Sequence, residues 1–189
     1  MSPQTINKEE LAETFRRCVQ RSLEQYCQVV FTKDPKVEQL DLIEYESRMR
    51  IFGLEKFNGT CYISLVNLYE SPLEAEHKDP CGVLLVYVEE ENAERLFKAL
   101  LKGVQGEDEE LIAENTQKLC IAVFEQLKKE LSQFGYPGIL MSAPENYLSN
   151  AEQGVDFPYD EDTLYQVSCI LWREKIVVAE LVLASAKHG

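Results

Sequence analysis

The order of helical and strand patterns along the chain constrains the fold more than any other feature. One helical pattern precedes three strand patterns, a short and a long helical pattern follow, and three more strand patterns complete the sequence. Strands joined by turns form an antiparallel sheet, and amphipathic helices bury their apolar faces against it. We therefore predict an α+β fold of two layers. It would be a pseudo-repeat of a helix plus three strands, with the long helices on one face of a mainly antiparallel sheet.

The first repeat begins with a capped helix. Asn7 followed by Glu10 is typical of a helix N-terminus. Apolar residues recur at helical spacing from 11 to 30, which predicts one long amphipathic helix. Asp34-Pro35 is expected to end it.

Three strands are predicted next. Asn58-Gly59 lies between the alternating segments Met49–Ile51 and Cys61–Leu65. It indicates a β-hairpin, because Asn and Gly tolerate positive φ. After a polar loop over residues 69–80, the segment 82–88 is apolar without alternation, which predicts a strand covered on both faces.

Two helices open the second repeat. Asn92 is expected to cap a short helix closed by Gly103. A long helix is expected from the acidic cluster at 107–110 to about Phe134, with glycines and a proline at 135–138 stopping it. Acidic residues in a first turn complement the helix dipole, so this cluster has a structural explanation.

The last part of the chain carries the remaining strands. A strand is predicted at 139–144, and the polar segment 145–162 is predicted to be a loop. Alternating residues at 165–172 and an apolar run at 176–184 predict two strands joined by a turn at 173–175.

Length and charge narrow the function. The chain has 189 residues, with 19 Lys and Arg against 33 Asp and Glu, for a net charge of −14. The length suits one domain over 1–189, with a core at about 8–184. Such an acidic surface repels phosphate backbones and anionic lipids, which argues against nucleic acid and membrane partners. The N-terminus lacks the features of an export signal, so we expect a cytoplasmic protein.

The chemistry of cysteine and histidine is expected to play no part. Six cysteines are scattered through mostly apolar segments, and none forms a C-x-x-C pair. We expect reduced thiols and no metal site. The two histidines, His77 and His188, have no neighbours typical of a triad or a metal site. Acidic residues at 156–162 lack the spacing of a calcium loop.

The long helix carries the candidate functional site. Its core stripe contains Ile112, Leu119 and Val123, whereas Glu114, Gln117 and Ile121 fall together on the opposite face at about 100° per residue. One interpretation is a solvated helix face with a stray isoleucine. The other is a docking face that presents an acid and an amide to a partner.

The chain resembles the CheC/CheX/FliY family of chemotaxis phosphatases, and specifically its CheX-like branch. The resemblance consists of local patterns in the family's order: the first hairpin, the short helix closed by Gly, the signature helix and the strand ending in Ser-x-Pro. In this chain they are Met49–Leu54, Asn58-Gly59, Thr60–Val66, Ala93–Gly103, Glu107–Leu131 and Gly138–Pro144.

The resemblance implies a hydrolase that dephosphorylates the phospho-aspartate of a CheY-like response-regulator receiver domain. The family signature Glu-x-x-Asn corresponds here to Glu114-Asn115-Thr116-Gln117, so Gln replaces Asn. By analogy Glu114 contacts the partner's lysine, Gln117 orients the attacking water and Ile121 contributes to partner binding. No cofactor of its own is implied, because the receiver supplies Mg²⁺.

Two alternatives stay open beside the phosphatase. One is a non-catalytic module that binds a response regulator, and the other is a structural component of a signalling or motility assembly.

A homodimer is also expected, from the resemblance and from the apolar strands Cys81–Val88 and Ile176–Ala184, which would be prone to aggregation if they were exposed at a sheet edge. Two other segments resemble the signature, and neither is expected to be a site. Glu89–Asn92 has the pattern Glu-x-x-Asn, but Asn92 is expected to cap a helix, and Glu13–Arg16 lacks the amide.

Overall fold

The computed structural model describes residues 7–101, 108–158 and 161–186. Gly103, His188 and Asp160 lie outside the described residues. The helices are α1 (Lys8–Ser22), the π-helical turn η1 (Leu23–Cys27), α2 (Leu54–Phe57), α3 (Pro72–His77), α4 (Glu90–Leu96), α5 (Glu109–Leu131) and the 3₁₀ turn η2 (Ser132–Phe134). The strands are β1 (Lys36–Asp41), β2 (Glu44–Tyr45), β3 (Arg48–Phe52), β4 (Cys61–Tyr69), β5 (Gly82–Glu89), β6 (Leu140–Met141), β7 (Glu145–Leu148), β8 (Asn150–Val155), β9 (Thr163–Leu171) and β10 (Glu174–Leu183).

An antiparallel sheet of seven strands organises the structure. Its order is β1-β9-β10-β5-β4-β6, and β7 also pairs with β4. The central strands β4, β5 and β10 are buried along almost their whole length. The prediction of a strand covered on both faces at residues 82–88 is therefore confirmed.

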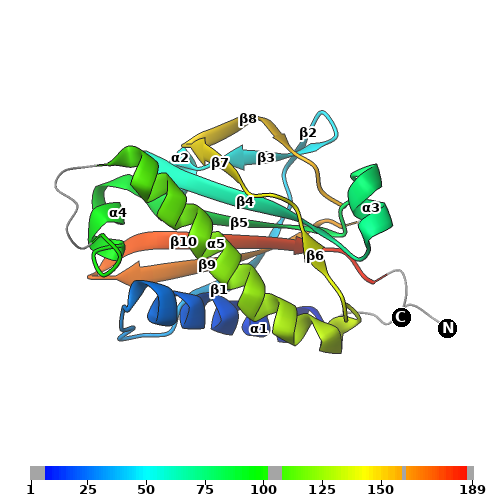
Figure 1. Ribbon diagram of the computed structural model, residues 1–189, viewed down its shortest axis with the longest axis horizontal. Helices are drawn as coiled ribbons and strands as arrows, with labels where there is room; N and C mark the ends of the chain where they lie inside the picture. The colour runs from blue at the N-terminus through cyan, green and yellow to red at the C-terminus, as the bar shows by residue number, and fades with distance from the viewer. Residues whose placement is uncertain (1–6, 102–107, 159–160, 187–189) are drawn as a thin grey trace.

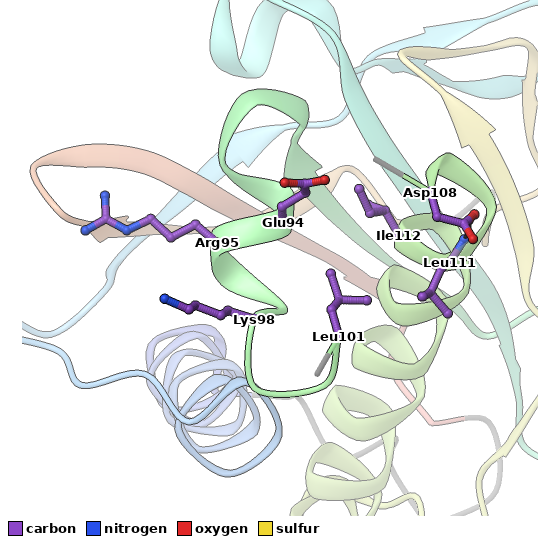
Figure 2. A pocket seen from close by; sticks show the side chains of 7 residues that line it. All are labelled: Glu94, Arg95, Lys98, Leu101, Asp108, Leu111 and Ile112. Atoms are coloured by element: carbon purple, nitrogen blue, oxygen red, sulfur yellow. Dashed lines mark hydrogen bonds between the residues drawn. The ribbon is translucent and has the colours of Figure 1, made fainter. Parts of the chain in front are cut away.

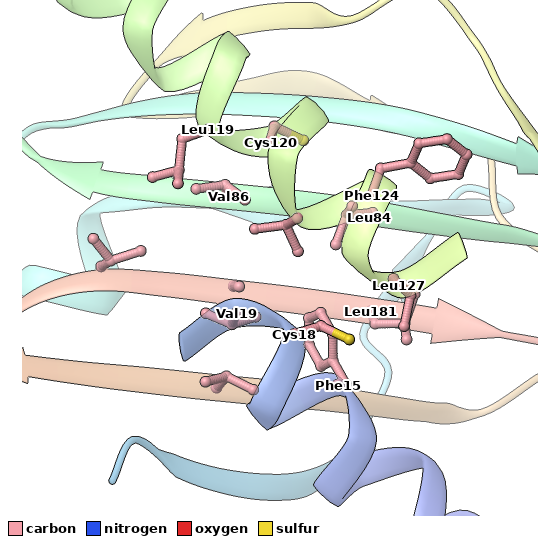
Figure 3. Packing of buried hydrophobic residues seen from close by; sticks show 14 of the residues in the cluster. Phe15, Cys18, Val19, Leu84, Val86, Leu119, Cys120, Phe124, Leu127 and Leu181 are labelled. Atoms are coloured by element: carbon pink, nitrogen blue, oxygen red, sulfur yellow. The ribbon is translucent and has the colours of Figure 1, made fainter. Parts of the chain in front are cut away.

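The two long helices cover one face of this sheet (Figure 1). Helix α5 packs on β4 and β5, α1 packs on β1 and β9, and the helices also contact each other. Figure 3 shows the side chains that fill this layer. They come from both helices and the strands beneath them: Phe15, Cys18, Val19, Leu119, Cys120, Phe124, Leu127, Leu84, Val86 and Leu181. The α+β class, with long helices on one face of an antiparallel sheet, is thus confirmed.

The opposite face of the sheet is partly covered by a second, smaller sheet. Strand β3 pairs with β2 on one side and with β8 on the other. Met49 and Ile51 of β3 and Val155 of β8 pack with Leu85 and Val178 of the large sheet. This third layer explains why the middle strands lack alternation, because neither of their faces meets water.

The prediction of a β-hairpin around Asn58-Gly59 is wrong, because the two flanking strands do not pair with each other. Strand β3 lies in the small sheet and β4 in the large one, and α2 lies between them. Asn58 has a positive φ of 58° and forms the C-cap of α2, with its N–H donating to the carbonyl of Leu54. Asn58 has the positive φ that the prediction required, but here that conformation ends a helical turn instead of forming a hairpin, and Gly59 is not among the glycines with positive φ.

One helix end and two segments predicted to be loops also differ from the prediction. The first α-helix ends at Ser22 and continues as the π-helical turn to Cys27, where Gln28 adopts a left-handed conformation. The polar segment 69–80 contains α3, which is capped by Ser71. Residues 145–162, predicted to be a loop, contain β7 and β8. Short polar strands of this kind lack the apolar alternation on which strand prediction depends.

The two most apolar strands do not lie at an edge. Strands β5 and β10 pair with each other and each has a second neighbour, β4 and β9 respectively. The edge argument for a dimer is therefore wrong, and the expectation of a dimer depends on the family resemblance alone. No helix in the described part of the chain is long and apolar enough to cross a membrane.

Candidate functional site

Helix α5 places the three predicted residues on its outer face. The Asp108 side chain caps the helix by accepting a hydrogen bond from the N–H of Leu111. Three residues on, Glu114 is exposed, and Gln117 and Ile121 are half-buried. The predicted core stripe of Ile112, Leu119 and Val123 on the opposite face is buried, and it continues through the buried Leu127 and Phe134.

The amide of Gln117 is held by a residue from another element. Asn146 of β7 donates a hydrogen bond from Nδ2 to Gln117 Oε1 at 3.0 Å. Asn146 is fixed in turn because β7 pairs with β4, with Asn146 opposite Ser64. An amide oxygen has two lone pairs, so Gln117 Oε1 can accept a second hydrogen bond beside the one from Asn146. Sequence reasoning missed Asn146, because its segment lacked a strand pattern.

Glu114 has a neighbour on its own helix. Its carboxylate forms an ion pair with Lys118 at 2.6 Å, one turn further along. Both side chains are about half exposed, at 52% and 51%, so the pair contributes little to stability and opens readily. The carboxylate is therefore available to an incoming cation at the cost of a weak contact.

The two residues between Glu114 and Gln117 are buried and turned toward the protein. Asn115 donates from Nδ2 to the carbonyl of Leu111 at 2.8 Å and accepts from the hydroxyl of Tyr26 at 3.0 Å. Burial raises the pKa of Tyr26 to about 12, so this hydroxyl remains a donor at neutral pH. Thr116 donates to the carbonyl of Ile112. Gln117, and not Asn115, thus shares the open face with Glu114.

The other two signature-like segments have structural roles. Glu89 is the N-cap of α4, and its Oε2 accepts from both the backbone N–H and the side-chain amide of Asn92 at 3.0 and 2.9 Å. The cap is therefore Glu89, and the prediction that Asn92 caps this helix is wrong. Glu13 and Arg16 form a two-fold hydrogen-bonded ion pair, which lowers the pKa of Glu13.

A cavity of about 490 Å³ lies between α4 and the first turn of α5, and none of Glu114, Gln117 and Ile121 lines it. Figure 2 shows Leu111 and Ile112 on α5 and Leu101 on the segment that follows α4, while Arg95 and Lys98 point away from α5. We assign the cavity no ligand.

The six cysteines are all free and buried. Burial raises the pKa of the Cys120 thiol to about 12 and that of Cys18 to about 11. A thiol with such a pKa is protonated and unreactive at neutral pH. Among the described residues, no group of three or more His, Cys, Asp or Glu side chains is placed to hold a metal ion.

The fold is shared with solved chemotaxis proteins. The chemotaxis protein CheX from Desulfovibrio desulfuricans superposes with a TM-score of 0.59 at 11% identity, covering 92% of this chain and 99% of that one. A CheC-like protein from Shewanella sp. PV-4 gives 0.57 at 14% identity, covering 93% and 97%. The FliM middle domain from H. pylori gives 0.54 at 14% identity, covering 94% of each chain. By sequence, no family model and no curated protein matches the chain.

These similarities define the class of fold: it is the fold of the CheC/CheX/FliY family, as predicted from the sequence. Within that class the chain is similar to CheX proteins over nearly its whole length.

Proposed function

We propose that the chain is a CheX-like phosphatase that hydrolyses the phospho-aspartate of a CheY-like receiver domain, with a role in chemotaxis or a related two-component pathway. The observation that carries the proposal is the open face of α5. There a carboxylate, Glu114, and an amide restrained from a second element, Gln117, lie one turn apart on a CheX-like fold.

The proposed chemistry requires positioning more than covalent work. A water oxygen attacks the phosphorus, the bond from phosphorus to the aspartyl oxygen breaks, and the products are aspartate and inorganic phosphate. The free acceptor position on Gln117 Oε1 would receive a hydrogen bond from this water and turn a lone pair of its oxygen toward the phosphorus. Holding a reactant in an attack geometry accounts for several orders of magnitude in rate.

Glu114 is assigned to the partner. In the complex it would exchange Lys118 for the receiver's active-site lysine, in a setting from which water is excluded. A charge pair in such an interface contributes more than an exposed one. The Mg²⁺ that neutralises the phosphoryl oxygens would be the receiver's own. Ile121 adds apolar contact area beside these two polar groups.

A second candidate is a non-catalytic module that binds a response regulator or joins a signalling or motility assembly. Two observations favour it: Gln117 replaces the family Asn, and the FliM middle domain has the same fold. Phosphate release from phosphorylated receivers separates the two candidates. Co-purification then separates a receiver-binding module from an assembly component. The genes adjacent to this one would indicate which receivers to test.

The proposal keeps the expectations of a cytoplasmic location and a homodimer. Sedimentation tests the second expectation, and a monomer at roughly tens of micromolar would contradict it.

A further inference from the structure

The turn between β9 and β10 contains residues that its backbone does not favour. Leu171 pairs with Glu174, so Trp172 and Arg173 form a two-residue hairpin turn. Both have positive φ, 53° and 72°. Such turns favour Asn-Gly, because a bulky side chain at positive φ is strained. Strained positions are concentrated at functional sites, so the chain's sole tryptophan at this position calls for a functional explanation.

This tryptophan belongs to an exposed apolar surface. Val30 is 84% exposed, Ile170 is 59% exposed and Trp172 is 38% exposed, and the three line one groove of about 560 Å³. One face of the Trp172 ring carries the guanidinium of Arg95, whose Cζ lies 3.9 Å from the ring centroid. Tryptophan and arginine are the residues most enriched at the energetic centres of interfaces. The groove, defined by Val30, Ile170 and Trp172, therefore has the composition of a binding surface.

The same groove exposes an open strand edge. Strand β1 begins at Lys36, which pairs with Ser168, and Pro35 before it has no N–H to donate. The last residues of β9, Cys169–Leu171, consequently have a strand partner only on the β10 side within the described part of the chain. An extended segment could add to this edge and place alternate side chains in the groove.

The charge at the groove is opposite to that of the whole chain. Four charged residues line it: Lys33, Asp34, Lys36 and Arg173. Asp34 is paired with Arg16, and Lys36 is paired with Glu38. Lys33 and Arg173 form no ion pair in the ranges that the structure describes. In a chain of net charge −14, a groove with three cations and one anion favours an acidic ligand.

We propose that the groove binds an extended acidic segment of a partner protein, which adds to the edge of β9 and inserts an apolar side chain between Val30, Ile170 and Trp172. Acidic side chains of the segment pair with Lys33 and Arg173. This surface is separate from the α5 face, so the proposal does not depend on the phosphatase activity.

Fluorescence of Trp172 tests the proposal directly, because it is the chain's only tryptophan. The probe is an N-acetylated octapeptide that alternates Glu and Val, titrated into the full-length protein. We expect a saturable change in the emission of Trp172 that weakens as salt is added. Octapeptides alternating Lys with Val and Glu with Ser are the controls, and neither should give this change.

Three variants complete the test. Ile170→Asp and Arg173→Glu should each weaken peptide binding at least tenfold. Lys129→Glu, on the exposed part of α5, makes the same charge change as Arg173→Glu and should leave binding unaltered. Circular dichroism checks that each variant is folded. The proposal is overturned if the Glu-Val peptide gives no change, if the Lys-Val peptide binds equally well, or if sedimentation shows that Ile170→Asp converts a dimer into a monomer. The last result would mean that a second copy covers the groove.

Discussion

Gln117 of α5 accepts a hydrogen bond from Asn146 of β7 at 3.0 Å, across 29 residues of sequence. The glutamine side chain has one methylene more than the asparagine of the family signature, and therefore one more rotatable bond. A longer amide without a support would sample several rotamers and orient a water poorly. The Asn146 contact restrains the Gln117 amide, and we propose that this restraint lets Gln replace Asn in the proposed site.

The first prediction concerns this pair of amides. Asn146→Ala should lower the rate constant of phosphate release by about tenfold to a hundredfold, with little change in the affinity for the receiver, because only the orientation of Gln117 is lost. Gln117→Asn should also lower the rate, since the shorter amide no longer reaches Asn146. The double variant Gln117→Asn, Asn146→Gln moves the methylene to the other side chain and should recover much of the activity. Stopped-flow measurement of receiver dephosphorylation gives both parameters.

The double variant also guards against a purely structural effect. If both single variants and the double variant are equally slow, the hydrogen bond does not position the amide. Higher activity of Gln117→Asn alone would mean that the chain has moved away from an asparagine-based site, and the role of Asn146 would be refuted.

The second prediction separates docking from chemistry. Glu114→Ala and Ile121→Asp should each weaken receiver binding, the first by removing a partner for its lysine and the second by placing a charge in the interface. Lys118→Ala should leave binding equal or tighter, because it frees the Glu114 carboxylate from its ion pair. Unfolding free energies should change by about half a kcal/mol or less in all three, since the positions face away from the core. Calorimetric titration measures the affinities; unchanged binding in Glu114→Ala and Ile121→Asp would refute the docking face.

The third prediction concerns a buried charge in the sheet. Glu180 of β10 is 1% exposed, and its carboxylate accepts hydrogen bonds from Lys56 of α2 and from Tyr87, the latter at 2.6 Å. Lys56→Met leaves this carboxylate without its cation and should destabilise the fold by about 3 kcal/mol. The double variant Lys56→Met, Glu180→Met removes both charges and should be more stable than the single variant. Urea unfolding measures both, and a single variant as stable as wild type would contradict the assignment.

The fourth prediction concerns the thiols. Burial raises the pKa of Cys27, Cys61 and Cys120 to about 12. The folded protein should therefore react slowly with a thiol reagent at pH 8, and all six thiols should react once it is denatured without reductant. Because unfolded thiols lose their protons above about pH 8.5 while the folded ones keep them, stability should be unaffected below that pH and should fall as the pH rises beyond it. Fewer than six reactive thiols in freshly purified, denatured protein would contradict the prediction that all six cysteines are unpaired.

Periodicity was sufficient to predict most of the helix-covered layer. The apolar stripe of α5 and the uninterrupted strand at 82–88 determine which surfaces must be buried, and both were identified correctly. Strand β7 of the large sheet and β8 of the small sheet could not be predicted in this way, because both are short and polar and are held by pairing with strands distant in sequence. Asn58 signals a positive φ, but sequence alone does not distinguish a hairpin turn from a helix C-cap.

In the candidate site, too, residues on a single element could be predicted and contacts between elements could not. Glu114, Gln117 and Ile121 lie on one helix, so the helical period alone places them together. Asn146 comes from a strand 29 residues away, and no local pattern connects it to Gln117. The pairing of Lys56 with Glu180, across 124 residues, could not be predicted for the same reason.

The most direct test of the account is phosphate release from a phosphorylated receiver domain, measured alone, with this protein and with its Gln117→Ala variant. The account predicts that the wild-type protein accelerates release well above the receiver's spontaneous rate. It also predicts that Gln117→Ala binds the receiver but restores a rate close to the spontaneous one. If the wild-type protein and the variant both leave several candidate receivers at their spontaneous rates, the phosphatase proposal is contradicted and the binding module takes its place.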